Sequence, residues 1–371
     1  MTGCVLRMAL VVLALLAALG GQAMALEQEE ILDSQAQALD LDELERAAED
    51  YAPQVEWKDG LDLNQGLESL LDTGTDALHG VVRKGLRSGV LLLVIVLLAG
   101  VADSAGAAGN KGSFQAVPVA AALAITAVAV VDANTLIGMG KEAISHMEQF
   151  SKVLLPTVAA ATAASGAPMG AAARQLAAML FSDLLMTLIS RVLLPLVYAY
   201  IAACTAYAAI GNEGLKRIAA TLKWVVTSIL TLVLLCFVGY LTVSGVIAGT
   251  TDAITIKAAK FTMSSVVPVV GGILSDAAET VLAGAGILKN TVGVFGMLVV
   301  LGMCLLPFLQ LGIHYLTYKI TAALSATVAD ARVAGLIDSI SGAFGLVLGM
   351  TGSCALLLLV SMVSAVSLVP A

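Results

Sequence analysis

Long apolar stretches fill most of the chain after residue 88, and they limit the folds that it can adopt. A helix needs about 20 consecutive apolar residues to cross a bilayer. The chain is 59% hydrophobic and 12% charged, whereas soluble domains are about a quarter charged. With aromatic residues at only 5%, the sequence lacks the aromatic girdles of a β-barrel. We therefore predict an all-α polytopic membrane protein, a helical bundle. Eight apolar stretches lie at 88–102, 116–136, 153–170, 176–210, 222–249, 262–275, 287–316 and 343–369.

Four prolines lie inside apolar runs, each directly after two bulky aliphatic residues: Pro156, Pro195, Pro268 and Pro307. The first two are 39 residues apart, as are the last two. Proline removes a helix hydrogen bond, and membrane helices tolerate it where neighbours or a wet cavity satisfy the freed carbonyl. We expect Pro195 and Pro307 to kink long spans. Pro156 and Pro268 are expected in short, re-entrant elements, because the stretches around them are short. Broken helices in matching positions of two halves indicate a conduit or binding site.

The proline spacing suggests an internal repeat with halves at about 150–249 and 262–369. The segment from Ser151 to Pro156 is similar to the segment from Ser190 to Pro195. Chance is the alternative, because Leu, Val and Pro recur easily in membrane proteins.

The first 87 residues differ from the rest. Residues 1–25 have the pattern of a signal peptide, with an uncleaved anchor as the alternative. Residues 26–87 are predicted to be an acidic, amphipathic-helical, extracytoplasmic segment, followed by a transmembrane domain at 88–371. Between residues 27 and 80 there are 16 acidic and 2 basic residues. Leu41, Leu44 and Ala48 share one helix face, which we expect to contact a partner or the membrane body; a solvated acidic face is the alternative.

Ionisable residues inside apolar stretches are the next candidates for a function. A charge at the bilayer centre costs on the order of 2.5–3.5 kcal/mol on insertion scales, so such residues should face the bundle interior, pair, or reach the interface. Asp183 and Arg191 are eight residues apart, about two turns, and are expected on one helix face. They are candidates for lining a polar path, and an internal ion pair or snorkelling is the alternative. Asp132, His314 and Lys319 are of the same kind.

The most polar part of the transmembrane domain runs from residue 249 to 290. Asp276 and Glu279 fit a capping box that would open a helix over 277–288. A short apolar element between charged turns is typical of a re-entrant loop or an assembly surface, and an ordinary connection between spans is the alternative. The candidate residues are Lys257, Lys260, Gly271, Gly272, Asp276, Glu279 and Lys289.

The sequence contains no enzyme motif. Residues 138–142 lack the first glycine and the Ser/Thr of a phosphate-binding loop, and no histidine stands near a nucleophile. We expect no catalytic residue, no metal and no cofactor.

Charge distribution predicts the topology. With the acidic segment outside and the Pro156 and Pro268 elements re-entrant, Lys216, Lys223 and Arg332 lie on the cytoplasmic side, as the positive-inside rule requires. Arg83, Lys84 and Arg87 then lie outside, against the rule.

The stretch Thr251 to Phe261, followed by Pro268 to Gly272, Leu274 to Thr280 and Leu288 to Asn290, resembles the stage III sporulation protein AE family of endospore-forming Firmicutes. The resemblance implies a non-enzymatic subunit in the mother-cell membrane around the forespore. It implies a channel or secretion-like complex between the two cells that supports forespore development. The implied partners are membrane lipid, other membrane subunits and further copies of the chain, with no nucleic acid.

Two classes of function stay open at this point. The protein either forms part of the conduit, with its proline-broken elements lining a path, or it is a non-conducting scaffold for other subunits. A stand-alone small-molecule permease is a third alternative.

Overall fold

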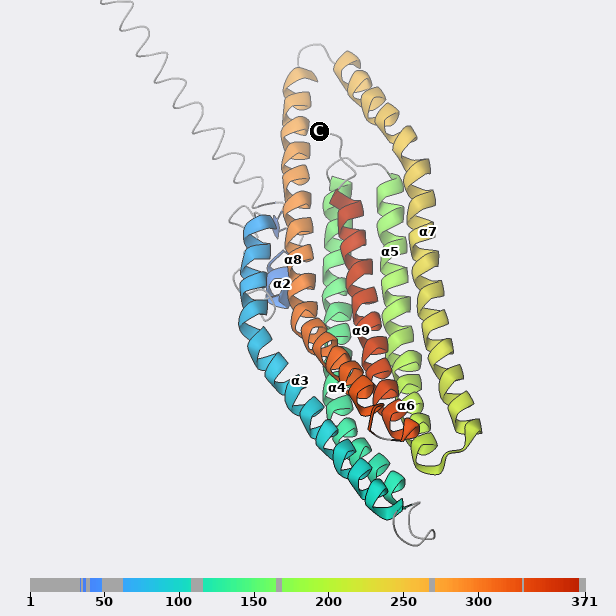
Figure 1. The fold of residues 1–371 in the computed structure, drawn as a ribbon. Coiled ribbons are helices and arrows are strands. Elements are labelled where there is room, and N and C mark those ends of the chain that lie inside the picture. The colour runs from blue at the N-terminus through green and yellow to red at the C-terminus, as the bar shows by residue number, and fades with distance from the viewer. Residues whose placement is uncertain are drawn as a thin grey trace, which may run out of the picture.

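In the computed structural model, the chain folds into long helices that run side by side (Figure 1). The structure describes residues 34, 36–37, 41–48, 63–107, 116–164, 169–266, 271–328 and 330–366, and no strand occurs among them. The all-α prediction is confirmed. The elements are α2 (Leu41–Ala48), α3 (Leu63–Ala107), α4 (Ala116–Ala164), α5 (Met169–Leu188), the π-helix η2 (Ile189–Leu193), α6 (Leu194–Ile210), α7 (Glu213–Val266), α8 (Gly271–Ser325) and α9 (Ala331–Val366).

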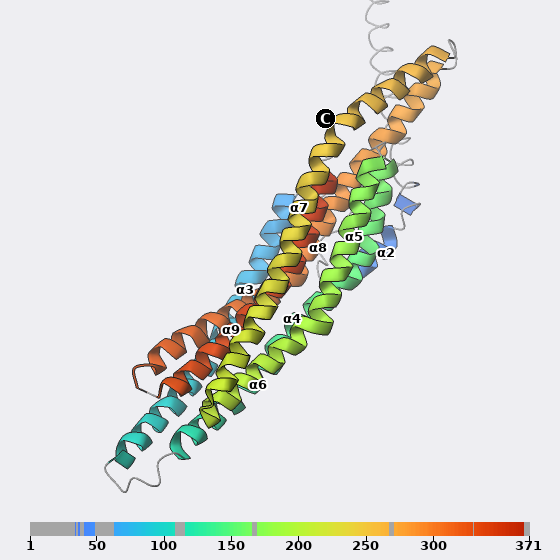
Figure 2. The same ribbon diagram turned by 90° about the vertical axis from the view of Figure 1, so that its right-hand side faces the viewer.

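Six segments of the described chain are long and apolar enough to cross a membrane. They are Gly66–Ala102, Val119–Ala163, Leu180–Ile210, Glu213–Tyr240, Asn290–Ser325 and Ala331–Val363. The eight predicted stretches reduce to six for two reasons: 116–136 and most of 153–170 join in α4, and 262–275 is shared between the end of α7 and the start of α8. The α6–α7 and α8–α9 connections lie at the same end of the bundle, where α3 also ends and α4 begins (Figures 1 and 2).

The structure contradicts the expectation for one proline, Pro156. We predicted a short separate element at Pro156, and this was wrong: Pro156 lies inside the continuous helix α4. Its ring is exposed on the helix surface, so it clashes with no neighbouring helix. One residue later, Thr157 Oγ1 donates a 2.8 Å hydrogen bond to the Val153 carbonyl. Side-chain hydroxyls of this kind help a membrane helix to continue past proline.

Pro195 stands two residues after Leu193, the last residue of the π-helix η2, and is the second residue of α6. The Leu194 amide donates to the Ile189 carbonyl, five residues back, so the helix widens by one residue before the proline. A π-bulge is one of the recognised causes of a helix bend. Pro307 is buried inside α8, and that helix changes direction along its length (Figure 1). Pro268 lies outside the described residues.

Glycines allow α3 to pack closely against α8. A Cβ placed on Gly66 would lie 2.4 Å from a Leu298 methyl carbon, and one on Gly89 would lie 2.6 Å from Thr317 Cγ2. Small residues let membrane helices approach each other, because lipid supplies no hydrophobic force that drives them together. The α3 helix runs without a break from the predicted acidic segment into the first apolar stretch.

The centre of the bundle is formed by α8, α9 and α4. Tyr318 of α8 is completely buried, and its ring meets the Phe344 ring of α9 edge to face at 5.0 Å. On the outside of α4, the short helix α2 buries Leu41, Leu44 and Ala48, the face that the sequence predicted. Part of the acidic N-terminal segment therefore packs onto the membrane body.

Two short turns fix the end of the bundle where α6, α7, α8 and α9 meet. Gly211 ends α6 with a left-handed φ of 75°, which glycine adopts without strain. Asp330 precedes α9, and its Oδ1 accepts a 2.8 Å hydrogen bond from the Arg332 amide. This hydrogen bond lowers the pKa of the Asp330 carboxyl below its ordinary value.

Candidate functional site

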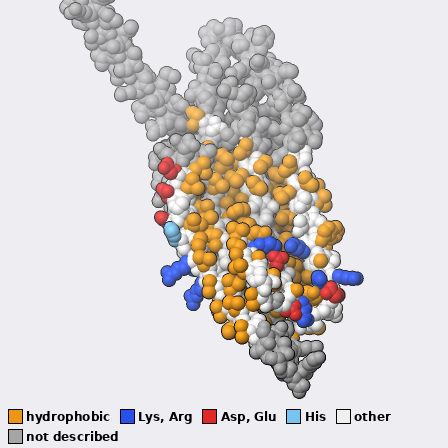
Figure 3. Space-filling model, viewed as in Figure 1, with side chains coloured by type: hydrophobic (Ala, Val, Ile, Leu, Met, Phe, Trp, Pro, Cys, Tyr) orange, Lys and Arg blue, Asp and Glu red, His pale blue; other side chains and the backbone are white. Residues whose placement is uncertain are grey.

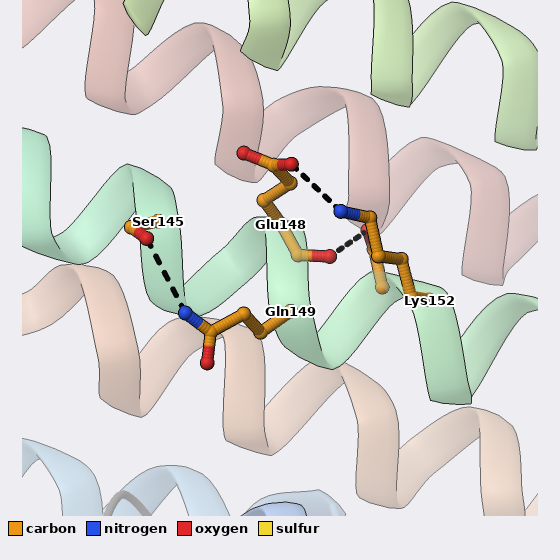
Figure 4. Close-up of polar contacts among 5 residues, drawn as sticks. Ser145, Glu148, Gln149 and Lys152 are labelled. Carbon is orange, nitrogen blue, oxygen red and sulfur yellow. Dashed lines mark hydrogen bonds and ion pairs between the residues drawn. The ribbon is translucent and has the colours of Figure 1, made fainter.

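A row of polar side chains runs along one side of α4 and forms what we name the α4 polar stripe: Lys141, Glu142, Ser145, Glu148, Gln149 and Lys152. Figure 4 shows the second half of this row. Lys152 Nζ lies 2.8 Å from Glu148 Oε1, and Gln149 Nε2 donates a 3.4 Å hydrogen bond to Ser145 Oγ. The Lys152 side chain is 59% exposed and the Glu148 side chain 25%. The stripe is therefore a surface of this chain, held in shape by its own contacts.

The stripe lies at the same level as an uncharged, largely apolar part of α8. A Cβ on Gly140 would lie 3.5 Å from Leu311 Cδ1, and one on Gly296 would lie 2.7 Å from Leu154 Cδ1. The stripe falls between these two contacts on α4. The facing part of α8, residues 296–311, contains no charged residue. Charges on α4 are thus presented beside a segment that is suited to the hydrocarbon interior.

Neighbouring helices border the stripe. Glu148 lies within electrostatic range of the fully buried Cys354 thiol of α9. Lys152 lies within electrostatic range of Asp183 of α5. The structure thereby brings one residue of the predicted conduit, Asp183, next to the stripe, and Pro156 stands one turn beyond Lys152 on the same helix.

Asp183 and Arg191 are both exposed, and the described contacts include no ion pair between them. Of the three outcomes that we expected for such residues, facing the bundle interior does not apply here, because the interior positions of this helix run are filled by Leu185, Ile189 and Leu193. Any polar path that they line is therefore on the outside of a single chain.

A second polar contact is buried between α4 and α8. Tyr318 Oη donates a 2.6 Å hydrogen bond to Asp132 Oδ2. His314, four residues earlier on α8, is also buried, and its Nδ1 lies 2.9 Å from the Gln310 carbonyl oxygen. Lys319 is paired with Asp338 of α9 at 2.6 Å near the end of the bundle. Three of the ionisable residues that the sequence singled out thus have protein partners.

The comparison with known families decides the identity of the chain. The family model described as Stage III sporulation protein AE matches residues 60–368. The chain belongs to this family. It is 29% identical over 210 residues to the stage III sporulation protein AE of Bacillus subtilis (strain 168), an overlap of 56% of this chain. The overlap spans only 52% of that relative's length. No solved structure matches the chain. The resemblance drawn from the sequence is confirmed.

The described residues of the polar stretch, 249–266 and 271–290, belong to two long helices in this sporulation protein. Lys257 and Lys260 lie in α7, and the remaining candidates lie in α8: Gly271, Gly272, Asp276, Glu279 and Lys289. Asp276 does not open a helix as predicted, because α8 begins at Gly271. The side chains of these candidates lie outside the described residues.

None of the six members of the α4 polar stripe was among the candidate residues that the sequence predicted. Its members recur at intervals of three or four residues, which places them on one side of a helix. That signal was available, but the stretch lies between two predicted spans and was assigned to neither. Among the described residues, no group of three or more His, Cys, Asp or Glu side chains could hold a metal ion. The α4 polar stripe is suited to lining a water-filled path for polar solutes.

Proposed function

We propose that this protein is an integral membrane subunit of a channel or secretion-like complex that links mother cell and forespore, with the α4 polar stripe on the wet side of the conduit. Family membership supports a role in sporulation, and the six apolar segments support a multi-pass membrane protein. The proposal extends these findings to a location in the mother-cell membrane around the forespore. It also includes a requirement for this subunit in forespore development.

The observation that carries the proposal is the position of the stripe. Each ionised side chain that faces hydrocarbon costs on the order of 2.5–3.5 kcal/mol. The total penalty for the four ionised members of the stripe is on the order of 10 kcal/mol, reduced by the attraction within the Glu148–Lys152 pair. These four members are Lys141, Glu142, Glu148 and Lys152. This penalty disappears when the face is turned to water or to another subunit. A ring of copies of this chain with their stripes facing inward would expose each stripe to water and place it beside another subunit.

A scaffold is the second candidate, and the geometry of the stripe also favours it. Glu142 and Lys141 are exposed, and within the described part of the chain no ion pair involves either. They could pair with opposite charges of another membrane subunit. In that case the stripe holds the complex together and conducts nothing.

The experiment separates assembly from passage. In sporulating cells the wild-type gene is replaced by Lys141→Gln/Glu142→Gln, by Arg191→Glu, or by the control Arg217→Gln, which lies at the end of the bundle away from the stripe. Assembly is scored by co-purification of the membrane complex. Passage is scored by transfer of a small fluorescent tracer between the two cells, together with spore yield.

Normal assembly with lost transfer supports the conduit, and lost assembly supports the scaffold. Normal assembly and transfer in both the stripe variant Lys141→Gln/Glu142→Gln and the Arg191→Glu variant would overturn both roles. We assign no catalytic role, because the family is named for sporulation and not for a reaction.

A further inference from the structure

A polar cavity of about 390 Å³ lies between α6, α7 and α9, at the end of the bundle where these helices connect. It is separate from the α4 polar stripe. Its size falls within the usual range of small-ligand sites, about 300–1,000 Å³. Tyr200, Cys204 and Tyr207 line it from α6, Lys216 and Lys223 from α7, and Arg332, Asp338 and Ser339 from α9. Three different helices thus direct three cations and several hydroxyl or thiol groups at one space.

The carboxylates around the cavity are already paired. Glu213 lies 3.5 Å from Lys216, Asp330 lies 3.4 Å from Arg332, and Asp338 lies 2.6 Å from Lys319, which stands outside the cavity. Lys223 is different. In the described part of the chain it has no carboxylate partner within ion-pair distance. The cavity therefore keeps a net positive charge.

Lys223 and Tyr200 converge over a glycine. A Cβ on Gly342 would lie 3.3 Å from Lys223 Nζ and 3.2 Å from Tyr200 Oη. An ammonium group and a hydroxyl group at one point are donors for phosphate oxygens. The absence of a side chain at Gly342 leaves both groups room at the cavity wall.

The surface next to the cavity is suited to lipid. Trp224 is 68% exposed beside Lys223, and Ile218 is 53% exposed beside Arg217. Tryptophan gathers at the level of lipid headgroups. Figure 3 shows Lys, Arg and acidic side chains gathered toward the lower part of this face, beneath a broad apolar surface. An anion with attached acyl chains would satisfy both surfaces at once, whereas a soluble anion would use only the cavity.

We propose that this cavity binds the phosphate group of an anionic phospholipid, with the acyl chains lying along the apolar surface of α7. Basic pockets between membrane helices on the cytoplasmic side commonly hold such headgroups. The positive-inside rule assigns this end of the bundle to the cytoplasm. The phosphate is held by Lys223, Arg332 and Tyr200.

The proposal is tested on the full chain in detergent by native mass spectrometry, with phosphatidylglycerol and phosphatidylcholine added in equal amounts. Wild type should retain phosphatidylglycerol preferentially. Lys223→Gln/Arg332→Gln should lower that retention roughly tenfold or more, because each cation near a membrane surface contributes about 1 kcal/mol. The control Arg83→Gln/Lys84→Gln removes the same charge from exposed sites on α3 and should leave retention unchanged.

Circular dichroism checks that the variants keep their helices. The single variant Lys223→Glu provides a second test, because it should lose more phosphatidylglycerol retention than the single variant Lys223→Gln. Equal retention by wild type and the cavity double variant would overturn the proposal. A titration in phosphatidylcholine nanodiscs provides a second way to overturn the proposal. It does so if inorganic phosphate binds wild type but not the double variant, while wild type shows no preference for phosphatidylglycerol. That outcome would assign the cavity to a soluble anion.

Discussion

At the scale of single residues, ionisable side chains in the transmembrane domain are accommodated in two ways. Asp132 is half-buried and accepts a hydrogen bond from a tyrosine 186 positions later in the chain. The members of the α4 polar stripe are exposed or half-exposed, and four of them contact one another in the pairs Glu148–Lys152 and Ser145–Gln149. The sequence identified Asp132 as a costly residue, but Tyr318 carries no sequence signal that distinguishes it from other membrane tyrosines. The hydrogen bond between Asp132 and Tyr318 forms only because α4 packs against α8.

Replacing Tyr318 by Phe should destabilise the protein by about 1–3 kcal/mol, because the Asp132 carboxylate loses its donor while it stays half-buried. The change keeps the ring and its edge-to-face contact with Phe344. The measurement is the thermal unfolding midpoint in detergent, followed by circular dichroism.

The matched control is Tyr315→Phe on the same helix, since the Tyr315 hydroxyl makes no hydrogen bond with any described residue. It should leave the midpoint nearly unchanged. The double variant Asp132→Asn/Tyr318→Phe should lose less than the sum of the two single changes. Equal midpoints for Tyr318→Phe and Tyr315→Phe would show that the hydrogen bond contributes nothing to stability.

At the scale of helices, apolar stretches in the sequence predict that spans exist, but not where each helix ends. Local signals at residues 137–152 and at Pro156 indicated an interruption. Buried residues within that part of the helix, Ile144 and Leu155 among them, continue the packing of α4 against α8 and α9 instead. Tertiary packing outweighs local preference here. The buried face of α2 was predictable because the helical spacing of Leu41, Leu44 and Ala48 defines it.

The approach of α3 to α8 depends on glycines. Gly89→Leu should weaken this helix pair by about 1–3 kcal/mol, because the new side chain would meet Thr317 and Thr321 at the position where a Cβ already comes within 3.0 Å of both. The measurement is resistance to limited proteolysis together with the unfolding midpoint.

Gly80→Leu is the control on the same helix, since a Cβ there has nothing within 4 Å. It should leave stability unchanged or raise it slightly through the better helix propensity of leucine. If Gly89→Leu behaves like Gly80→Leu, the close contact between α3 and α8 is not needed for the fold.

At the scale of the whole molecule, the number of crossings fixes the sides of the membrane. Glu213 and Lys257 lie in the same helix, α7, 44 residues apart, which is about 66 Å at 1.5 Å per residue. The hydrocarbon core is only about 30 Å thick, so a membrane-spanning α7 is expected to place the two positions on opposite sides. Asp330 precedes α9 at the same end as Glu213 (Figure 1). The charge distribution in the sequence leads to the same expectation, although through re-entrant elements, and the continuous helix α4 removes the one at Pro156.

Single cysteines at Glu213, Lys257 and Asp330, in a background without the native cysteines, should therefore label from two different sides. In spheroplasts of a bacterial host, a membrane-impermeant maleimide should react with Lys257→Cys and spare Glu213→Cys and Asp330→Cys. In inverted membrane vesicles the pattern should reverse, because the positive-inside rule puts the Lys216, Lys223 and Arg332 end in the cytoplasm. Labelling after detergent denaturation should be equal at all three positions. Reaction of Glu213→Cys and Lys257→Cys from the same side would contradict a membrane-spanning α7, and with it the six-span arrangement that places the anionic-lipid cavity at the cytoplasmic surface.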